Sequence, residues 1–244
     1  MGKVKVCVIV PCFNEADNVV DVIDDILSNV SQNEGWEVIA INDCSNDDTL
    51  SVLENDKRTT ILDLPCNLGV GAAVQAGFKY AVSNDFDYAF KFDGDGQHMG
   101  SCLNGLLDTL KKNEADFVVG LRFINKNNQG FQSTPLRRAG IHFFRFLIGF
   151  LSGYIPSDPT SGLRGYNKKA IKFAARYYPS FDYPEPEELL LLKRNGFKMR
   201  DIYTEMRERQ GGESSISPFR SVYYMLKVAF AILMVALRPK EKEC

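Results

Sequence analysis

The sequence is poor in the side chains that hold transition metals or form disulfide frameworks. Its 244 residues contain only two histidines, and none of its six cysteines belongs to a C-x-x-C pair. This pattern fits neither a zinc site nor a disulfide scaffold, so we expect reduced thiols and a cytoplasmic location. The formal net charge of −2 lacks the basic excess typical of nucleic-acid-binding proteins, and no nucleic-acid partner is expected.

Long apolar runs are missing as well. No stretch reaches the ~20 uninterrupted apolar residues of a membrane-spanning helix. The first strand-like run begins at Val4, too early for a secretory signal peptide to precede it. What remains is an ordinary globular composition, 45% hydrophobic and 25% charged. A chain of this length can bury one sizeable core.

Strand-like and helical patterns alternate through the first half of the chain. The strand-like runs are Val4–Val10, Trp36–Ile41, Thr59–Leu64, Asp87–Phe92 and Asp116–Leu121. Helical spacing of apolar residues marks Asp17–Val30, Thr49–Asn55, Val70–Val82 and Cys102–Lys112. This alternation predicts an α/β fold with a mostly parallel sheet flanked by helices, whose ligands bind at the carboxyl ends of the strands.

The second half of the chain breaks this alternation. Helices are expected at Leu136–Leu151, near Lys168–Ala175 and at Leu189–Arg194, with a strand at Phe197–Tyr203. Phe219–Leu237 reads as a long apolar helix. We therefore expect one catalytic domain over residues 1–217. Residues 218–244 are expected to form a C-terminal apolar helix and basic tail that contacts a membrane surface or another subunit.

Asp93-Gly94-Asp95 is the sharpest local feature, because two carboxylates at a strand end can approach a divalent ion. Magnesium favours one or two carboxylates together with phosphate oxygens. Gln97 and His98 follow closely and add possible ligand or orienting groups. The alternative is an ordinary Asp-Gly turn between a strand and a helix.

Three further motifs accompany this one in a fixed order. They are Val8–Glu15 (VIVPCFNE), Ile41–Thr49 (INDCSNDDT) and Asn67–Ala73 (NLGVGAA), followed by Phe92–His98 (FDGDGQH). With this ordered set, the chain resembles the family-two inverting glycosyltransferases, which have the GT-A fold, over roughly its whole length. Within that family it most resembles the dolichyl-phosphate-mannose-synthase-like branch, which glycosylates polyprenyl phosphates.

The resemblance implies a nucleoside-diphosphate sugar donor, UDP- or GDP-linked, and a Mg²⁺ or Mn²⁺ cofactor. It assigns nucleobase and ribose binding to Pro11, Phe13, Glu15 and Asp43. It assigns the metal and diphosphate to Asp93, Gly94 and Asp95, with Gln97 also reaching the metal and Arg122 near the phosphates. On the acceptor side it implies that Asp158 lies near the sugar, and that Arg209 and Ser215 belong to a lid over the diphosphate.

Several of these residues have a simpler interpretation. Glu15 would also be favourable as an acid in the first turn of a helix. Asp43 is a possible turn or cap residue, and Asp158 precedes a proline, as turn-forming aspartates often do. The segment that contains Arg209 and Ser215 would serve equally well as a solvated charged loop.

The acceptor determines whether a general base is needed. A sugar hydroxyl must lose its proton to a base, whereas a lipid monophosphate is already largely dianionic at neutral pH. The candidate bases are Glu185, Glu187 and Glu188, of which Glu187 is the one selected. Their string, Pro-Glu-Pro-Glu-Glu, also describes an ordinary helix start. Transfer to a saccharide in cell-surface polysaccharide assembly remains the alternative function, and a non-catalytic nucleotide-sugar-binding subunit is a third.

Two apolar segments favour a lipid acceptor. Ile141–Ile155 is rich in phenylalanine and lies close to Arg137, Arg138 and Arg145. Aromatic side chains beside arginines suit a helix at the headgroup level, where an arginine such as Arg138 meets a phosphate. Val222–Leu237 is too short and interrupted to span, so we expect it to lie in the plane of a membrane surface or in a homo-oligomer interface. Ordinary amphipathic core helices are the alternative. The expected location is peripheral, on the cytoplasmic face of the membrane.

Overall fold

The computed structural model describes residues 3–94, 96–121, 135–179, 182–205 and 218–241, with only the backbone described for residues 135–139 and 218–224. Its centre is a seven-stranded sheet in the order β3-β2-β1-β4-β6-β5-β7. The strands are β1 (Lys5–Cys12), β2 (Gly35–Asn42), β3 (Thr59–Asp63), β4 (Tyr88–Lys91), β5 (Phe117–Leu121), β6 (Arg164–Asn167) and β7 (Met199–Tyr203). Every pairing is parallel except the two that β6 makes with β4 and β5. The predicted mostly parallel sheet is confirmed.

The strand β6 was missed by the sequence interpretation. It is four residues long and reads Arg-Gly-Tyr-Asn, which has neither the apolar run nor the alternation of a typical strand. It is inserted between β4 and β5, so these two strands, consecutive in the sequence, are not neighbours in the sheet.

The first strand also extends two residues further than expected, through Pro11 to Cys12. The amide of Phe92 donates to the carbonyl of Ile9 at 3.0 Å, so Ile9 faces β4, and Pro11, two residues on, faces the same side. The strand β4 ends at Lys91, opposite Ile9, and therefore has no residue paired with Pro11. The missing N–H of Pro11 thus removes no hydrogen bond between the two strands.

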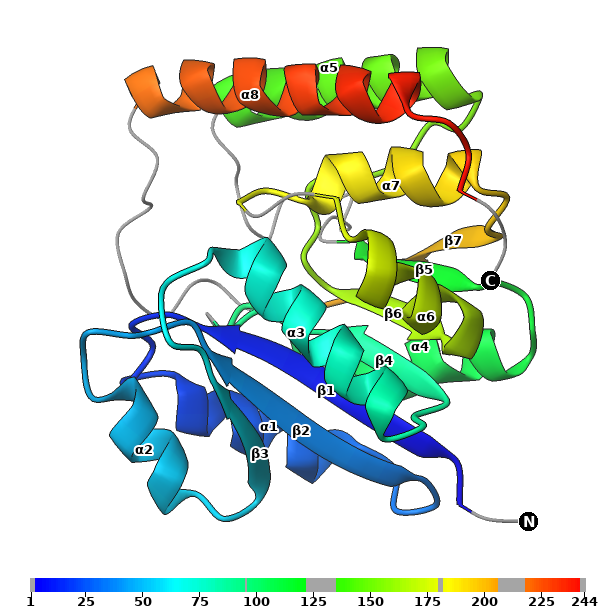
Figure 1. Cartoon of the computed structure of the whole chain (residues 1–244). Coiled ribbons are helices and arrows are strands. Elements are labelled where there is room, and N and C mark those ends of the chain that lie inside the picture. The colour runs from blue at the N-terminus through cyan, green and yellow to red at the C-terminus, as the bar shows by residue number, and fades with distance from the viewer. Residues whose placement is uncertain (1–2, 95, 122–134, 180–181, 206–217, 242–244) are drawn as a thin grey trace.

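Helices cover both faces of the sheet (Figure 1). They are α1 (Val19–Asn29), α2 (Thr49–Asn55), α3 (Val70–Ser83), α4 (Cys102–Lys111), α5 (Pro135–Ser152), α6 (Lys168–Tyr177), α7 (Glu185–Arg194) and α8 (Pro218–Leu237). Alternate β1 residues point to opposite sides: Val6, Val8 and Val10 join the core cluster with α1 and α4, whereas Cys7 and Ile9 join the cluster with α3, α6 and α7.

An additional helical layer lies on one side of this α/β body. The helices α5 and α8 run beside each other over α7, away from the sheet (Figure 1). Their inner faces contribute Phe144, Ile148, Val228, Ile232 and Val235 to the core. Among the described residues, neither these helices nor any other is long and apolar enough to cross a membrane.

Candidate active site

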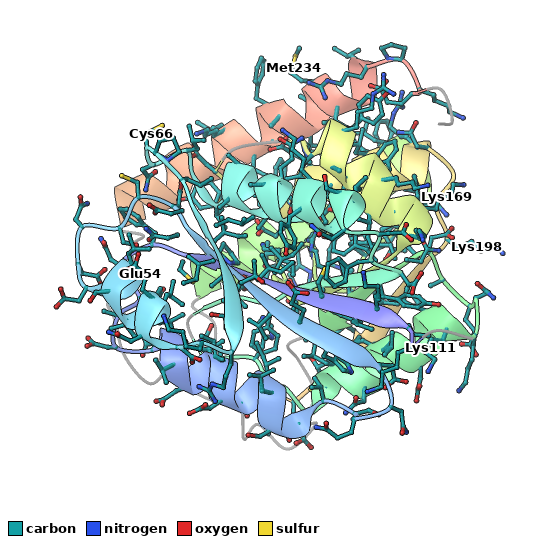
Figure 2. The ribbon with its side chains drawn as sticks, turned by 60° about the horizontal axis from the view of Figure 1, so that its bottom comes forward. Glu54, Cys66, Lys111, Lys169, Lys198 and Met234 are labelled. Atoms are coloured by element: carbon teal, nitrogen blue, oxygen red, sulfur yellow. The ribbon has the colours of Figure 1, made fainter. Side chains whose placement is uncertain are left out.

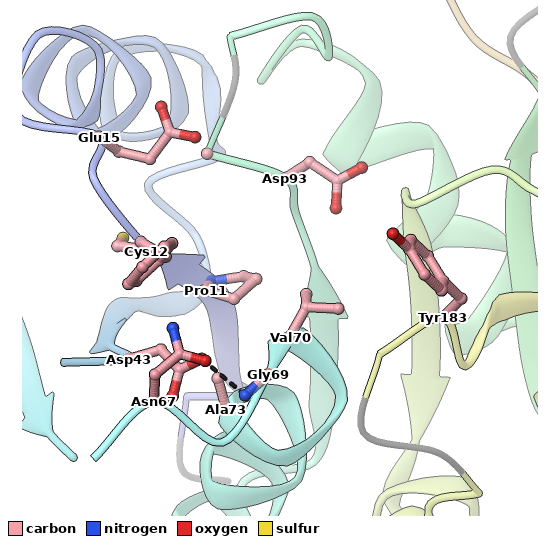
Figure 3. Close-up of a pocket in the computed structure, with 12 residues that line it drawn as sticks. Pro11, Cys12, Glu15, Asp43, Asn67, Gly69, Val70, Ala73, Asp93 and Tyr183 are labelled. Carbon is pink, nitrogen blue, oxygen red and sulfur yellow. Dashed lines mark hydrogen bonds between the residues drawn. The ribbon is translucent and has the colours of Figure 1, made fainter. Parts of the chain in front are cut away.

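A cavity of about 470 Å³ opens at the carboxyl ends of β1, β2 and β4 (Figure 3). Its described lining residues are Pro11, Cys12, Phe13, Glu15, Asp43, Asn67, Gly69, Val70, Ala73, Asp93, Gly94 and Tyr183. They come from the ends of the three strands, from the segment that leads into α3, from the first turn of α3 and from the residues before α7. Parallel strands direct their carboxyl ends to the same edge, which is why motifs far apart in the sequence meet here.

Six of the residues selected from the sequence are brought together in this cavity. They are Pro11, Phe13, Glu15, Asp43, Asp93 and Gly94. Glu15 and Asp93 both line the cavity, and the carboxylate of Asp93 and the hydroxyl end of Tyr183 point towards each other (Figure 3). No sequence pattern indicated Tyr183 as a site residue, because it reaches the cavity only through the tertiary placement of the segment before α7.

Asp43 holds the wall of the cavity in place. Its two carboxylate oxygens accept hydrogen bonds from the backbone amides of Leu68 at 2.8 Å and Gly69 at 2.9 Å. Gly69 has a φ of +86°, which favours glycine at this position. Asp43 thus anchors the entrance to α3. Each carboxylate oxygen has a second lone pair, so the side chain keeps acceptor capacity towards a ligand.

Glu15 lies before the first helix and not inside it. The helix α1 begins at Val19, with Asn18 at its N-cap position, so the first-turn interpretation of Glu15 is not what the structure shows. The amide of Glu15 donates to Thr49 Oγ1 at 2.9 Å, and its Oε2 accepts from the Asn18 side chain at 3.0 Å. These contacts fix Glu15 at the rim, beside the start of α2.

Asp93 is held from behind by two buried side chains. Lys91 Nζ lies 3.7 Å from Asp93 Oδ1, and His98 Nε2 lies 3.5 Å from Oδ2. The side chains of Lys91 and His98 are 1% and 2% exposed, whereas that of Asp93 is 33% exposed. A Cβ atom on Gly162 would fall 1.7 Å from Asp93 Oδ2, so only glycine leaves room for the carboxylate.

These groups suit a hard divalent cation. A half-exposed carboxylate on the wall of an open cavity is the ligand that magnesium and manganese prefer when phosphate oxygens complete their coordination. Within the described part of the chain, which does not include Asp95, there is no cluster of three or more metal-binding side chains. Gln97 is half-buried and lies four residues after Asp93.

Behind Asp93, four charged residues form two ion pairs between the sheet and α7. Lys91 on β4 and Arg164 on β6 are direct partners in the antiparallel register, so their side chains share one face. Lys91 Nζ forms a short ion pair with Glu185, and Arg164 Nη1 contacts Glu188 Oε2 at 2.5 Å. Two adjacent buried cations are thus matched by two glutamates three positions apart on one helix.

Burial and the ion pairs act in opposite directions on these charges. Burial lowers the pKa of Lys91, but the nearby charges of Glu185 and Asp93 outweigh it, and the pKa is raised above its ordinary value. At Glu188, burial raises the pKa of the carboxyl group, and the nearby Arg164 guanidinium only partly offsets this increase. Lys91 therefore keeps its positive charge at neutral pH.

The candidates for acceptor chemistry lie away from the cavity wall. Asp158 is buried, and its Oδ1 accepts from the amide and the hydroxyl of Thr160 at 3.0 and 2.9 Å, as in a turn after Pro159. Glu187 is 4% exposed, and neither residue is among those described as lining the cavity. Asp95, Arg122, Arg209 and Ser215 lie outside the described residues, and only the backbone of Arg138 is described.

The sequence interpretation overlooked Lys91 as a site residue. A lone lysine in an otherwise apolar strand, two residues before Asp93, was the available signal, because a period of two places both side chains on one face. This signal did not identify the partner of the lysine. The partner, Glu185, lies 94 residues later in the chain.

Comparison with known proteins agrees with this geometry. The glycosyl transferase family 2 model matches residues 7–173. The UDP-N-acetylglucosamine–dolichyl-phosphate N-acetylglucosaminyltransferase of Methanococcus voltae is 27% identical, over 93% of this chain and 96% of that protein. The polyprenol monophosphomannose synthase of Mycolicibacterium smegmatis is 26% identical, over 92% and 86%.

A solved structure shows the same architecture. Glucosyl-3-phosphoglycerate synthase from Mycobacterium tuberculosis, in complex with Mn²⁺, UDP and phosphoglyceric acid, aligns with a TM-score of 0.69 and 17% identity, covering 98% of this chain and 80% of that one. The fold is therefore of the GT-A type. The family match covers more than half of the chain, including the ends of β1, β2 and β4 that form the cavity. The chain belongs to glycosyl transferase family 2 and is a glycosyltransferase.

Proposed function

We propose that this enzyme transfers a sugar, with inversion, from a UDP- or GDP-sugar to a polyprenyl phosphate in a reaction that requires Mg²⁺ or Mn²⁺. The observation that carries the proposal is that one cavity joins Asp43 and Glu15 at one side to Asp93 at the other. Such a cavity accommodates a nucleoside at one end and a metal-bound diphosphate at the other. Relatives that cover nearly the whole chain are named for transfer to dolichyl or polyprenyl phosphate, which supports this acceptor.

In this proposal the donor lies along the strand ends. Pro11, Phe13, Glu15 and Asp43 hold the nucleoside. Asp93 and Gly94 hold the metal and diphosphate together with Asp95 and Gln97. The bound ion would neutralise the diphosphate as the glycosidic bond breaks. Arg122, Arg209 and Ser215 complete the phosphate contacts, since a leaving diphosphate needs positive charge and hydrogen-bond donors around it.

The surroundings of the glutamates favour an acceptor that needs no base. Glu185 and Glu188 are engaged in ion pairs with Lys91 and Arg164. Asp158 accepts two bonds from Thr160. A phosphate monoester is already anionic at neutral pH and can attack the anomeric carbon without losing a proton to the enzyme. Asp158 and Glu187 then serve to shape the acceptor side and do not act as general bases.

An apolar surface on α5 and α8 suits a lipid acceptor. The exposed apolar side chains on these helices are Phe143, Phe146, Phe150, Leu226, Phe230, Leu233, Met234 and Leu237. Met234 projects from the outer side of α8 (Figure 2). Arg238 and Lys240 follow directly after α8 and are exposed. We propose that residues 218–244 and α5 lie on the cytoplasmic surface of a membrane, with Arg138 near an anionic headgroup.

The decisive test is a transfer assay with purified enzyme. It would combine UDP- and GDP-sugars with Mg²⁺ or Mn²⁺, in the presence and absence of undecaprenyl or dolichyl phosphate. The expected result is a lipid-linked sugar whose formation needs both metal and lipid and is lost in Asp93→Asn. Metal-dependent transfer only to saccharides would overturn the proposed acceptor, and donor binding without any turnover would indicate a non-catalytic subunit.

A further inference from the structure

The ion pair between Lys91 and Glu185 lies directly behind the carboxylate that faces the cavity. Lys91 Nζ contacts Glu185 on α7 and lies 3.7 Å from Oδ1 of Asp93. The lysine side chain is 1% exposed, and that of Glu185 is 15% exposed. The ammonium group is therefore shared between two carboxylates in surroundings from which water is largely excluded.

Charges interact strongly in such surroundings. A lysine this close to a carboxylate competes with any cation for it, and the competition is weakly screened because the lysine is buried. Glu185 acts against this effect, because it attracts the same ammonium group towards α7. The attraction of Asp93 for a cation in the cavity therefore depends on how strongly Lys91 interacts with Asp93 and how strongly it interacts with Glu185.

We propose that Lys91 and Glu185 are positioning residues that set the affinity of the Asp93 site for its divalent ion, in opposite directions. Lys91 weakens ion binding and Glu185 strengthens it. This inference rests on the metal-dependent transfer proposed above. A moderate affinity suits an enzyme that must release a metal-bound nucleoside diphosphate in every catalytic cycle, because product release limits many such enzymes.

The opposite signs distinguish this role from a merely structural one. If the pair only held the fold together, removing either member would disturb Asp93 and weaken ion binding in both cases. Electrostatic control predicts instead that Lys91→Met tightens ion binding and Glu185→Gln weakens it. Groups that contact metal ligands usually alter affinity by about tenfold or more, so we expect shifts on the order of tenfold in each direction.

A double variant controls for folding. Removing one partner of a buried ion pair is usually destabilising, whereas replacing both is often tolerated. Lys91→Met/Glu185→Gln should therefore melt close to the wild type and bind the ion with an affinity between those of the two single variants. Lys168→Met is a matched control, because Lys168 pairs with Asp85 near the other end of β4.

The experiment is a titration with Mn²⁺, with free ion followed by electron paramagnetic resonance, in the absence and presence of UDP or GDP. The expected result is opposite shifts for the two single variants and no shift for Lys168→Met. Shifts in the same direction, or no shift in either variant, would overturn the inference. Absence of Mn²⁺ binding by the wild type under every condition would instead contradict the metal requirement of the proposed function.

Discussion

Arg164 on β6 and Glu188 on α7 form an ion pair of 2.5 Å in which the two side chains are 0% and 2% exposed. The Tyr166 hydroxyl donates to the same carboxylate at 2.9 Å, and Arg164 Nε donates to the carbonyl of Ser161 at 3.0 Å. The pair joins the antiparallel strand to the helix that carries Glu185. It therefore links the central sheet to α7, the helix against which α5 and α8 pack.

Breaking this pair on one side should be costly. Arg164→Met leaves the Glu188 carboxylate buried without its cation, and we expect the free energy of unfolding to fall by about 3–5 kcal/mol. Chemical denaturation monitored by circular dichroism measures the change. The double variant Arg164→Met/Glu188→Gln removes both charges and keeps an acceptor for Tyr166, so it should recover most of the loss. A double variant as unstable as the single one would contradict this account.

Gly162 should be needed for the position of Asp93. In Gly162→Ala the new Cβ atom would fall 1.7 Å from Asp93 Oδ2, so the carboxylate must move. We expect weaker Mn²⁺ binding and a loss of transfer activity of about 100-fold, as for displaced active-site groups. Activity assays and Mn²⁺ titration measure both effects.

Gly105→Ala is the matched control for that substitution. Gly105 lies within α4, and a Cβ atom there meets nothing within 4 Å. Alanine in an exposed helix interior should stabilise the protein by about 0.5–1 kcal/mol and leave transfer unchanged. Full activity in Gly162→Ala would show that Asp93 tolerates displacement and would contradict the prediction.

Cys12 should resist alkylation although it lines the cavity. Burial, with a smaller contribution from the negative charge of Glu15, raises the pKa of its thiol to about 12. At pH 8 only about one molecule in 10⁴ carries the reactive thiolate. Cys66 is exposed at the surface (Figure 2) and should react first. Mass spectrometry after iodoacetamide treatment of the native protein would reveal the order, and rapid labelling of Cys12 would disprove it.

The same thiol should make stability depend on alkaline pH. The pKa of Cys12 is raised from 9.0 to about 12 on folding, so between these values the unfolded chain loses a proton that the folded chain keeps. The contribution is complete below pH 9 and declines as pH rises towards 12, by up to about 1.4 kcal/mol per pH unit. Cys12→Ala should make the decline of unfolding free energy above pH 9 shallower by that amount. An unchanged slope would indicate a Cys12 pKa close to its ordinary value.

The exposed phenylalanines of α5 and α8 should mediate binding to lipid. Phe146 and Phe230 are 70% and 66% exposed, so Phe146→Ser/Phe230→Ser should leave the melting temperature nearly unchanged. We expect a large loss of co-sedimentation with vesicles that contain anionic phospholipid, because each side chain removes about 1.5–3 kcal/mol of apolar burial. Val82→Ser, at a 40% exposed position on α3, is the control. Unchanged vesicle binding together with loss of a dimer would indicate that this face contacts a second copy of the chain.

The parts of the site that depend on local sequence could be predicted. Apolar runs locate the ends of β1, β2 and β4 to within two residues, and parallel strands bring Glu15, Asp43 and Asp93 to one edge. What could not be predicted depends on tertiary partners. Arg164 is fully buried within a strand only because Glu188, 24 residues later, neutralises it. No local pattern indicates such a pairing, so β6 and the ion pairs that Glu185 and Glu188 make with the sheet were missed together.

The position of β6 has a consequence for synthesis on the ribosome. β5 leaves the ribosome before β6. It cannot pair with β4, because the position beside β4 in the finished sheet belongs to β6. A nascent chain that ends between β5 and β6 therefore holds a parallel β3-β2-β1-β4 unit whose β4 edge is open. Unpaired edges of this kind recruit other strands. We therefore expect co-translational assembly in two stages, with the β4 edge most open to wrong partners before Arg164 to Asn167 emerge.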